Sequence, residues 1–404
     1  MIGIDIDRPQ RQAWHTLIPS HEATLSEVRL VGDRFVALYM DDARHRLVRN
    51  ARNGAYQGEI DLPTLGAVLL GDPPRRFGQK EQTQELFYSF SSFTWPTSIH
   101  RYDFTRDASQ LVNEPQIDFD FDRCTVCQAF VVSTDGARVP YFLVQRADLT
   151  GAGPQPMLLY GYGGFDISLT PSFAIGRLVW LEMGGSLAVA NLRGGGEYGA
   201  AWHQAGMLQH KQQVFDDLIA VAEDLIAGGV TSPEKLAIQG GSNGGLLVGA
   251  AMTQRPELFG AALPAVGVMD MLRFHWFTIG WAWVLEFGSS DDPEQFATLY
   301  AYSPLHNPRS GVCYPPTLIT TADHDDRVVP GHSFKFAAAL QAAQGCDNPT
   351  LIHIQQKAGH GLGKPTSILI DEISDVWAFL VKVLGMDGRG VRTVSPAPEC
   401  TTGG

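Results

Sequence analysis

The run Gly-Gly-Ser-Asn-Gly-Gly at residues 240–245 decides the fold predicted for this chain. It lies between a short apolar run at 236–238 and a helical pattern of small and apolar residues at 246–253. A G-x-S-x-G sequence between a strand and a helix is typical of the nucleophile elbow of α/β-hydrolases, a turn so tight that its neighbours must lack side chains. The pattern predicts that the Ser242 hydroxyl stands above the sheet, at a helix N-terminus whose free N–H groups suit a developing oxyanion. The alternative is a flexible glycine and serine loop, because the chain has 43 glycines.

A base and an acid for Ser242 follow downstream in the chain order serine, aspartate, histidine that this fold uses. One strand pattern is followed by an acidic loop at 322–330, and a second strand pattern is followed by His360. Loops at the carboxyl ends of strands are where an open α/β sheet binds its ligands. A serine becomes a good nucleophile only beside a base that a carboxylate orients. The order therefore predicts a catalytic triad, although spacing alone does not choose among the three aspartates of the loop.

Composition and charge limit the classes of protein to which the chain can belong. The chain has 404 residues, 44% of them hydrophobic and 18% charged, as in a globular protein of two or three domains. Its net charge of −13 argues against a nucleic-acid partner or an anionic membrane, because both bind clustered Lys and Arg. No apolar run reaches membrane-spanning length, and the first residues do not resemble a signal peptide, so we expect a cytoplasmic protein.

The cysteines and the other possible metal ligands predict no covalent or metal framework. The five cysteines are scattered, and their odd number indicates no disulfide framework and a reducing compartment. Cys124 and Cys127 form a C-x-x-C pair. Because no second pair and no histidine cluster is near, we interpret them as ordinary strand residues; the alternative is a zinc or redox site. We expect no metal and no organic cofactor.

The pattern of apolar residues divides the chain near residue 125. Residues 1–125 contain short β-like runs with turn signals and no convincing helix, which predicts all-β repeats. In residues 126–386 a hairpin comes first, and strand patterns then alternate with helical patterns, of which 214–227 is one. Residues 387–404 are rich in Pro, Thr and Gly, and we expect them to be disordered.

Five motifs occur in a fixed order along the chain. They are Tyr-Gly-Tyr-Gly-Gly-Phe at 160–165, Asn-Leu-Arg-Gly-Gly-Gly-Glu-Tyr-Gly at 191–199, the elbow at 240–245, the acidic loop at 323–330 and Gly-His-Gly at 359–361. Together they resemble the prolyl oligopeptidase family of serine peptidases, from about residue 127 to about residue 386 and more weakly upstream. The resemblance implies that Asp325, rather than Asp323 or Asp326, is the acid of the triad.

The resemblance also implies the fold, an α/β-hydrolase with a doubly wound, mostly parallel sheet. In this family a seven-bladed β-propeller covers the hydrolase and admits only short, flexible peptides. A blade needs about 40 to 50 residues, so residues 1–125 hold two to three blades. The chain therefore resembles a family member that lacks the N-terminal segment and much of the propeller.

The family's catalytic roles map onto single residues of this chain. Ser242 matches the nucleophile, His360 the general base and Asp325 the residue that orients it. The oxyanion would be held by the backbone N–H of Asn243 and by the hydroxyl of Tyr162. The alternative for Tyr162 is simple packing, because aromatic residues in glycine-rich loops often do no more than pack.

The family's proline pocket also has counterparts here. The matching apolar walls are Trp283, which would stack on the proline ring, and Phe165, Val268, Val328 and Phe287, the last of which stands where we expect a tyrosine. Arg327 matches an arginine that donates hydrogen bonds to a substrate carbonyl. The alternatives are core packing for Trp283 and a local salt bridge with Asp323 or Asp326 for Arg327.

Three functions remain open from the sequence. The first is a monomeric serine peptidase that cleaves short proline-containing peptides after proline, without a cofactor. The second is an esterase or acylaminoacyl peptidase on the same fold. The third is a truncated homologue that is inactive because it cannot fold or preorganise the triad, or a fragment that only binds a partner.

Overall fold

The computed structural model describes residues 1–71, 84–361 and 363–386. The tail for which disorder is predicted, 387–404, lies outside the described residues. In the described part of the chain, no helix is both long enough and apolar enough to cross a membrane.

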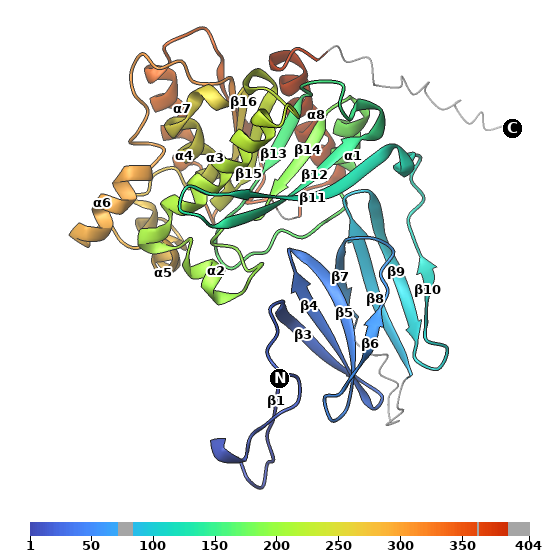
Figure 1. Ribbon diagram of the computed structural model, residues 1–404. Coiled ribbons are helices and arrows are strands. Elements are labelled where there is room, and N and C mark those ends of the chain that lie inside the picture. Colours follow the sequence, from blue (N-terminus) through green and yellow to red (C-terminus); the bar gives the residue numbers. More distant parts are fainter. Residues whose placement is uncertain (72–83, 362, 387–404) are drawn as a thin grey trace, which may run out of the picture.

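The first part of the chain folds into two antiparallel sheets of four strands each (Figure 1). A short pair, β1 (Ile2–Gly3) and β2 (His15–Thr16), precedes them. The first sheet has the order β3-β4-β5-β6 and the second β10-β9-β8-β7. The strands are β3 (Thr24–Val31), β4 (Arg34–Asp41), β5 (Arg44–Ala51), β6 (Tyr56–Ile60), β7 (Ala67–Leu70), β8 (Glu85–Ser92), β9 (Trp95–Asp103) and β10 (Ala108–Asn113). These sheets confirm the predicted all-β region.

A shared apolar core holds the two sheets together. It combines side chains from both, among them Val36 and Leu47 of the first sheet and Tyr88 and Phe90 of the second. Strand residues alternate between the faces of a sheet, so every second residue of β8 is buried, and three of these, Leu86, Tyr88 and Phe90, belong to this core. Each sheet thus covers one face of the other.

An eight-stranded sheet forms the rest of the molecule, in the order β11-β12-β14-β13-β15-β16-β17-β18. Its strands are β11 (Cys124–Val132), β12 (Arg138–Arg146), β13 (Met157–Tyr160), β14 (Ser186–Ala190), β15 (Leu236–Gly241), β16 (Ala261–Ala265), β17 (Thr317–Ala322) and β18 (Thr350–Gln355). The hairpin β11–β12 is antiparallel, and the pairs from β14 to β18 are parallel. The order confirms the predicted mostly parallel sheet, with β15 inside it and β18 at its edge.

Helices cover both faces of this sheet, as a doubly wound fold requires (Figure 1). The helices are α1 (Ile175–Glu182), α2 (Ala200–Gln204), α3 (Gln212–Ala227), α4 (Asn243–Gln254), α5 (Val284–Phe287), α6 (Pro293–Tyr302), α7 (Gly331–Ala343) and α8 (Thr366–Val383). Helices α3, α4 and α7 share one core cluster, and α1 and α8 share the other. Neighbouring residues of β15 divide between these clusters, Ile238 entering the first and Ala237 the second.

The all-β region contacts the rest of the molecule through a few specific groups. The Tyr198 hydroxyl donates to Asp42 Oδ1 at 2.6 Å. The backbone N–H of Phe173 donates to Ser91 Oγ at 3.0 Å. Phe93 packs against Phe142 of β12, with ring centroids 5.4 Å apart. The two parts of the chain are thus joined by both polar and apolar contacts.

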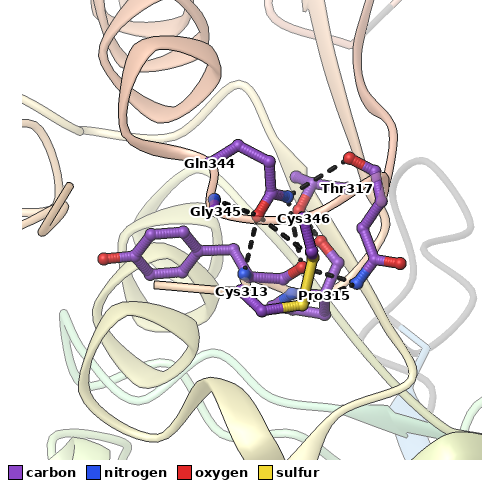
Figure 2. Close-up of a disulfide and its surroundings, with 8 residues drawn as sticks. Cys313, Pro315, Thr317, Gln344, Gly345 and Cys346 are labelled. Atoms are coloured by element: carbon purple, nitrogen blue, oxygen red, sulfur yellow. Dashed lines mark hydrogen bonds between the residues drawn. A yellow bond between two sulfur atoms is a disulfide. The ribbon is translucent and has the colours of Figure 1, made fainter. Parts of the chain in front are cut away.

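The sequence predicted no disulfide framework, but one disulfide is present: Cys313 and Cys346 are bonded with their Cα atoms 5.1 Å apart (Figure 2). The chain runs from β17 through α7 to β18, and this crossover brings the residues before β17 next to those after α7. The backbone N–H of Gly345 donates to Val312 O at 2.8 Å, which holds the two cysteines in reach. Disulfides persist in oxidising environments, so the odd cysteine count no longer supports a reducing compartment. Cys124 and Cys127 are free and lie on β11, three residues apart and so on opposite faces.

Candidate functional site

Ser242 lies at the tight turn between β15 and α4. Its φ of 59° is rare for a residue with a side chain, and such strain is typical of functional positions. The turn leaves no room for side chains beside it: a Cβ on Gly240 would lie 2.3 Å from Gly244 O, and one on Gly245 would lie 2.6 Å from Ala265 O. The Ser242 N–H donates to Ala265 O at 2.9 Å, which ties the turn to β16. The geometry is that of a nucleophile elbow.

Asp325 and His360 come together from the loops that follow β17 and β18. His360 Nδ1 and Asp325 Oδ2 are 2.7 Å apart. The Asp325 side chain is fully buried, and its other oxygen, Oδ1, accepts from the N–H groups of Arg327 at 3.0 Å and Val328 at 2.9 Å. Both oxygens are thus engaged, and the carboxylate can hold one orientation of the imidazole ring.

The third contact of a triad is not formed. Within the described residues, no hydrogen bond joins Ser242 Oγ to His360. Catalytic hydrogen bonds of ligand-free enzymes are often long and shorten only when the substrate is bound. The structure therefore brings His360 to Asp325 and leaves both short of Ser242.

Tyr162 and Asn243 lie beside Ser242. Burial raises the pKa of the Tyr162 phenol above its ordinary value, and the neighbouring Ser242 side chain opposes part of this rise. Asn243 is the first residue of α4, where backbone N–H groups have no partner inside the helix. Its side-chain Nδ2 donates to Tyr162 O at 2.5 Å. Two neutral donors, a phenol and a helix N-terminus, therefore flank the serine.

The residues predicted to form the proline pocket belong to one apolar cluster. Val268, Val328 and Phe287 are buried in it, and Phe165 and Trp283 pack against it while staying partly exposed. Phe165 and Phe287 meet edge to face with centroids 5.4 Å apart. The partly exposed pair can therefore contact a ligand while the buried residues support it.

For Arg327, the structure does not support the salt bridge that was the alternative to a role in binding substrate. It is exposed, and its positive charge is near enough to Tyr162 to oppose a small part of the burial-driven rise in the pKa of that phenol. A salt bridge from Arg327 to Asp323 or Asp326 is not formed within the described residues; Asp323 Oδ1 instead contacts His324 Nδ1 at 2.7 Å. The guanidinium is thus available to a ligand beside Tyr162.

Sequence reasoning missed several residues of this region. Phe274 is fully buried between Trp283, with which it stacks at 6.4 Å, and Phe287. Lys211, Glu286 and His203 form a polar group behind residues 162–165. No sequence signal marks these four residues, because their partners are distant in the chain and their spacing follows no motif.

A cavity of about 270 Å³ also touches His360. It is lined from the α8 side by Val376 and Trp377 and by neither Ser242 nor Trp283, so it is distinct from the predicted proline pocket. Among the residues that the structure describes, no group of three or more His, Cys, Asp or Glu side chains is arranged to hold a metal ion.

Two family models match the chain. The model of the prolyl oligopeptidase family matches residues 171–387, and the model of the prolyl oligopeptidase N-terminal β-propeller domain matches residues 1–115. The first match contains the elbow and both loops of the His–Asp pair. The second covers the two four-stranded sheets.

Curated relatives agree with these models. The prolyl endopeptidases of Elizabethkingia meningoseptica and Dictyostelium discoideum are each 41% identical to this chain, over 96% and 92% of its length. The matched stretches are 54% and 49% of those proteins, so the chain spans about half the length of the curated relatives that it matches.

Solved structures show the same similarity in three dimensions. A structure from a study of two prolyl endopeptidases superposes with a TM-score of 0.90 at 43% identity, and the match covers 95% of this chain and 56% of that one. Prolyl oligopeptidase B from Galerina marginata, bound to a 35mer hydrolysis and macrocyclization substrate, superposes with a TM-score of 0.89 at 35% identity. That match covers 96% of this chain and 55% of the other. Because the family model also matches more than half of its 404 residues, the chain belongs to the prolyl oligopeptidase family.

Proposed function

We propose that this chain is a serine peptidase that hydrolyses short peptides on the carboxyl side of proline through an acyl-enzyme. The observation that carries the proposal is the pair of His360 Nδ1 and Asp325 Oδ2 at 2.7 Å, on loops that follow β18 and β17. The same sheet presents Ser242 at a strained elbow. The family membership and the prolyl endopeptidase relatives support the substrate class.

In the proposed reaction, Ser242 Oγ attacks the carbonyl carbon of the scissile peptide bond. His360 accepts the serine proton and then donates it to the leaving amine, so that an ester to Ser242 remains. Asp325 fixes the imidazole tautomer and stabilises the imidazolium that forms. A water molecule, activated by the same histidine, then hydrolyses the ester and releases the new carboxylate.

The negative charge that develops on the carbonyl oxygen needs donors already in place. We assign this role to the backbone N–H of Asn243 and the hydroxyl of Tyr162. The Tyr162 phenol keeps its proton at neutral pH even at its ordinary pKa of 10.0, so its partly buried hydroxyl is able to donate. Donors that are fixed in a partly buried site stabilise the transition state without reorganisation.

Specificity for proline would come from the apolar cluster beside the elbow. The flat indole of Trp283 can stack on a pyrrolidine ring, which has no N–H of its own to satisfy. Phe165 would form the opposite wall, and the buried Val268, Val328 and Phe287 would support both. Arg327 would donate to a carbonyl of the bound peptide. We further propose a monomer that uses no metal or organic cofactor.

The decisive experiment compares the native chain with Ser242→Ala. Hydrolysis of a blocked Gly-Pro anilide by the native chain, abolished in Ser242→Ala protein with unchanged circular dichroism, would support the proposal. Hydrolysis of p-nitrophenyl esters without cleavage of the anilide would identify an esterase instead. Soluble, folded protein with neither activity would contradict both.

A further inference from the structure

Three polar side chains lie behind the part of the site that carries Tyr162. Glu286 is 4% exposed, and its Oε2 contacts His203 Nε2 at 2.7 Å. Its Oε1 lies 3.7 Å from Lys211 Nζ. The side chains come from α5, from α2 and from the turn before α3, so they join three separate elements.

Two of these side chains, Lys211 and Glu286, form hydrogen bonds with backbone groups of the loop 162–165. Lys211 Nζ donates to Gly163 O at 2.8 Å, and the N–H of Phe165 donates to Glu286 Oε1 at 2.9 Å. Asn243 Nδ2 holds Tyr162 O in the same way. A loop with so many fixed peptide groups can hold its side chains in one place.

The charges of this group depend on one another. Lys211 is fully buried, and this burial lowers the pKa of its ammonium group to about 8 against the opposing attraction of Glu286. Its ammonium also lies over the Phe287 ring, 5.3 Å from the centroid. Removing one partner of a buried pair leaves the other charge uncompensated, which costs more than removing both. The pair can therefore be tested by single and double substitutions.

The same group reaches the predicted proline pocket. Glu286 immediately precedes Phe287, which meets Phe165 edge to face. The N–H of Phe165 is the group that Glu286 accepts. One carboxylate thus fixes the loop of the proposed oxyanion donor and a wall of the proposed pocket relative to each other.

We infer that Glu286 and Lys211 are positioning residues, which hold residues 162–165 so that the Tyr162 hydroxyl stays directed at the oxyanion. The inference rests on the proposed function. Neither residue touches the reacting atoms; both act through the backbone of the loop. Their loss should therefore reduce kcat through Tyr162.

A graded series at Glu286 separates positioning from general stability. Glu286→Leu removes the acceptor for Phe165 N–H, and Glu286→Gln retains it. We expect kcat for a p-nitrophenyl ester to fall about 30-fold in the Leu variant and less than about threefold in the Gln variant, because a small misplacement of a catalytic group costs up to about 100-fold. Glu197→Gln is the matched control, because Glu197 is equally buried and accepts from Leu169 N–H instead. Equal losses in Leu and Gln variants would overturn the inference.

A double-mutant cycle with Tyr162→Phe tests the route of the effect. If Glu286 acts through Tyr162, Glu286→Leu should cost less than about threefold in kcat once the hydroxyl is gone, a strong non-additivity. A merely structural residue would lower kcat by the same factor in both backgrounds, and this result would overturn the inference. If Glu286→Leu does not fold, the double substitution Lys211→Met/Glu286→Gln replaces it in the cycle with Tyr162→Phe. This variant removes both charges and the donor to Gly163 O.

Hydrogen exchange gives a readout that needs no activity. Peptides that cover residues 160–166 should exchange faster in Glu286→Leu than in the native chain, and at the native rate in Glu197→Gln. If the native chain hydrolyses the ester but not the anilide, the proposed proline specificity is refuted, and the double-mutant cycle measured with the ester still tests the inference.

If neither substrate is hydrolysed, the proposed function is refuted, and only hydrogen exchange tests the inference. Unchanged protection of residues 160–166 in Glu286→Leu would then overturn it.

Discussion

The two halves of the candidate site are built to different degrees. The half with the nucleophile lies inside the sheet, where Ser242 joins β15 to α4 and the neighbouring loop is held by Asn243, Lys211 and Glu286. The half with the base lies at the sheet edge, where His360 follows β18 and its ring is held by Asp325. Among the described residues, three side chains hold the loop beside Ser242, whereas a single carboxylate contacts the ring of His360.

The difference indicates which half of the site could stabilise the transition state in its present arrangement. A donor that is already in position contributes to transition-state stabilisation without reorganisation, so the nucleophile half can act at once. The base half has still to bring His360 to Ser242. We therefore expect substitutions in the base half to affect the reaction most when they release His360, and substitutions in the nucleophile half when they remove or shift a donor.

Asp325→Asn should have the largest effect of the substitutions that follow. The amide offers the wrong hydrogen-bonding pattern to the imidazole, and in a serine triad this change lowers kcat by about 10⁴-fold. The measurement is kcat for the blocked Gly-Pro anilide. Asp326→Asn, a change of the same kind at the exposed neighbour, is the control and should leave kcat unchanged. Similar losses in both variants would show that the loop, rather than the His360 contact, is responsible.

Loss of the disulfide should weaken the frame of the base half without affecting its chemistry. Cys313 and Cys346 are separated by 33 residues, and closing a loop of that length contributes about 4 kcal/mol to the free energy of unfolding in the chain-entropy model. We expect Cys313→Ser/Cys346→Ser to lose stability in urea and to keep its kcat. Cys124→Ser/Cys127→Ser changes two free cysteines and should lose little. A native urea midpoint in the first pair of substitutions would contradict the expectation.

Tyr162→Phe should lower kcat by about 10²- to 10³-fold, since it removes one oxyanion donor and keeps the ring. KM should change little, because the hydroxyl acts mainly in the transition state. Tyr160→Phe removes a phenol from the same loop region and is the control, because the Tyr160 ring contacts Arg177 rather than the serine. If Tyr162→Phe raises KM and spares kcat, the phenol binds substrate and is not an oxyanion donor.

Glu197→Gln, a substitution near the nucleophile half, should change how the free energy of unfolding depends on pH. Burial raises the pKa of Glu197 to about 7, above the 4.5 expected in the unfolded chain. Between these two values the native state binds more protons than the unfolded state, so stability falls as pH rises, by at most about 3 kcal/mol. The Gln variant lacks this loss. Urea unfolding at pH 4.5 and at pH 8 measures this loss of unfolding free energy, and Glu294→Gln, at an exposed position, is the control. Parallel pH profiles for the native and Glu197→Gln proteins would contradict the raised pKa of Glu197.

Much of the fold followed from local sequence. The glycines around Ser242 predicted the elbow because only a tight turn needs them, and the apolar spacing at 214–227 predicted α3 (Gln212–Ala227) to within two residues. The loops with Asp325 and His360 were placed correctly because they follow strands with a plain apolar pattern. The domain boundaries near residues 125 and 386 and the roles of the site residues stay predictions.

The features that the sequence did not predict depend on contacts between residues that are distant in the chain. The N–H of Phe165 and the carboxylate of Glu286 are 121 residues apart in the chain, and no local pattern pairs them. The Cys313–Cys346 disulfide needs the crossover through α7 to bring its ends together. An odd number of cysteines says only that at least one is unpaired, so it could not exclude this pair.

Fluorophosphonate labelling of the native chain tests most directly whether both halves assemble into one site. The reagent reacts with a serine only when a base activates it and donors receive the developing charge. We predict one label per chain, located on Ser242 by mass spectrometry of the digested protein, and labelling about 10³-fold or more slower in His360→Ala. Folded native protein that is not labelled, or is labelled at another residue, would contradict the account.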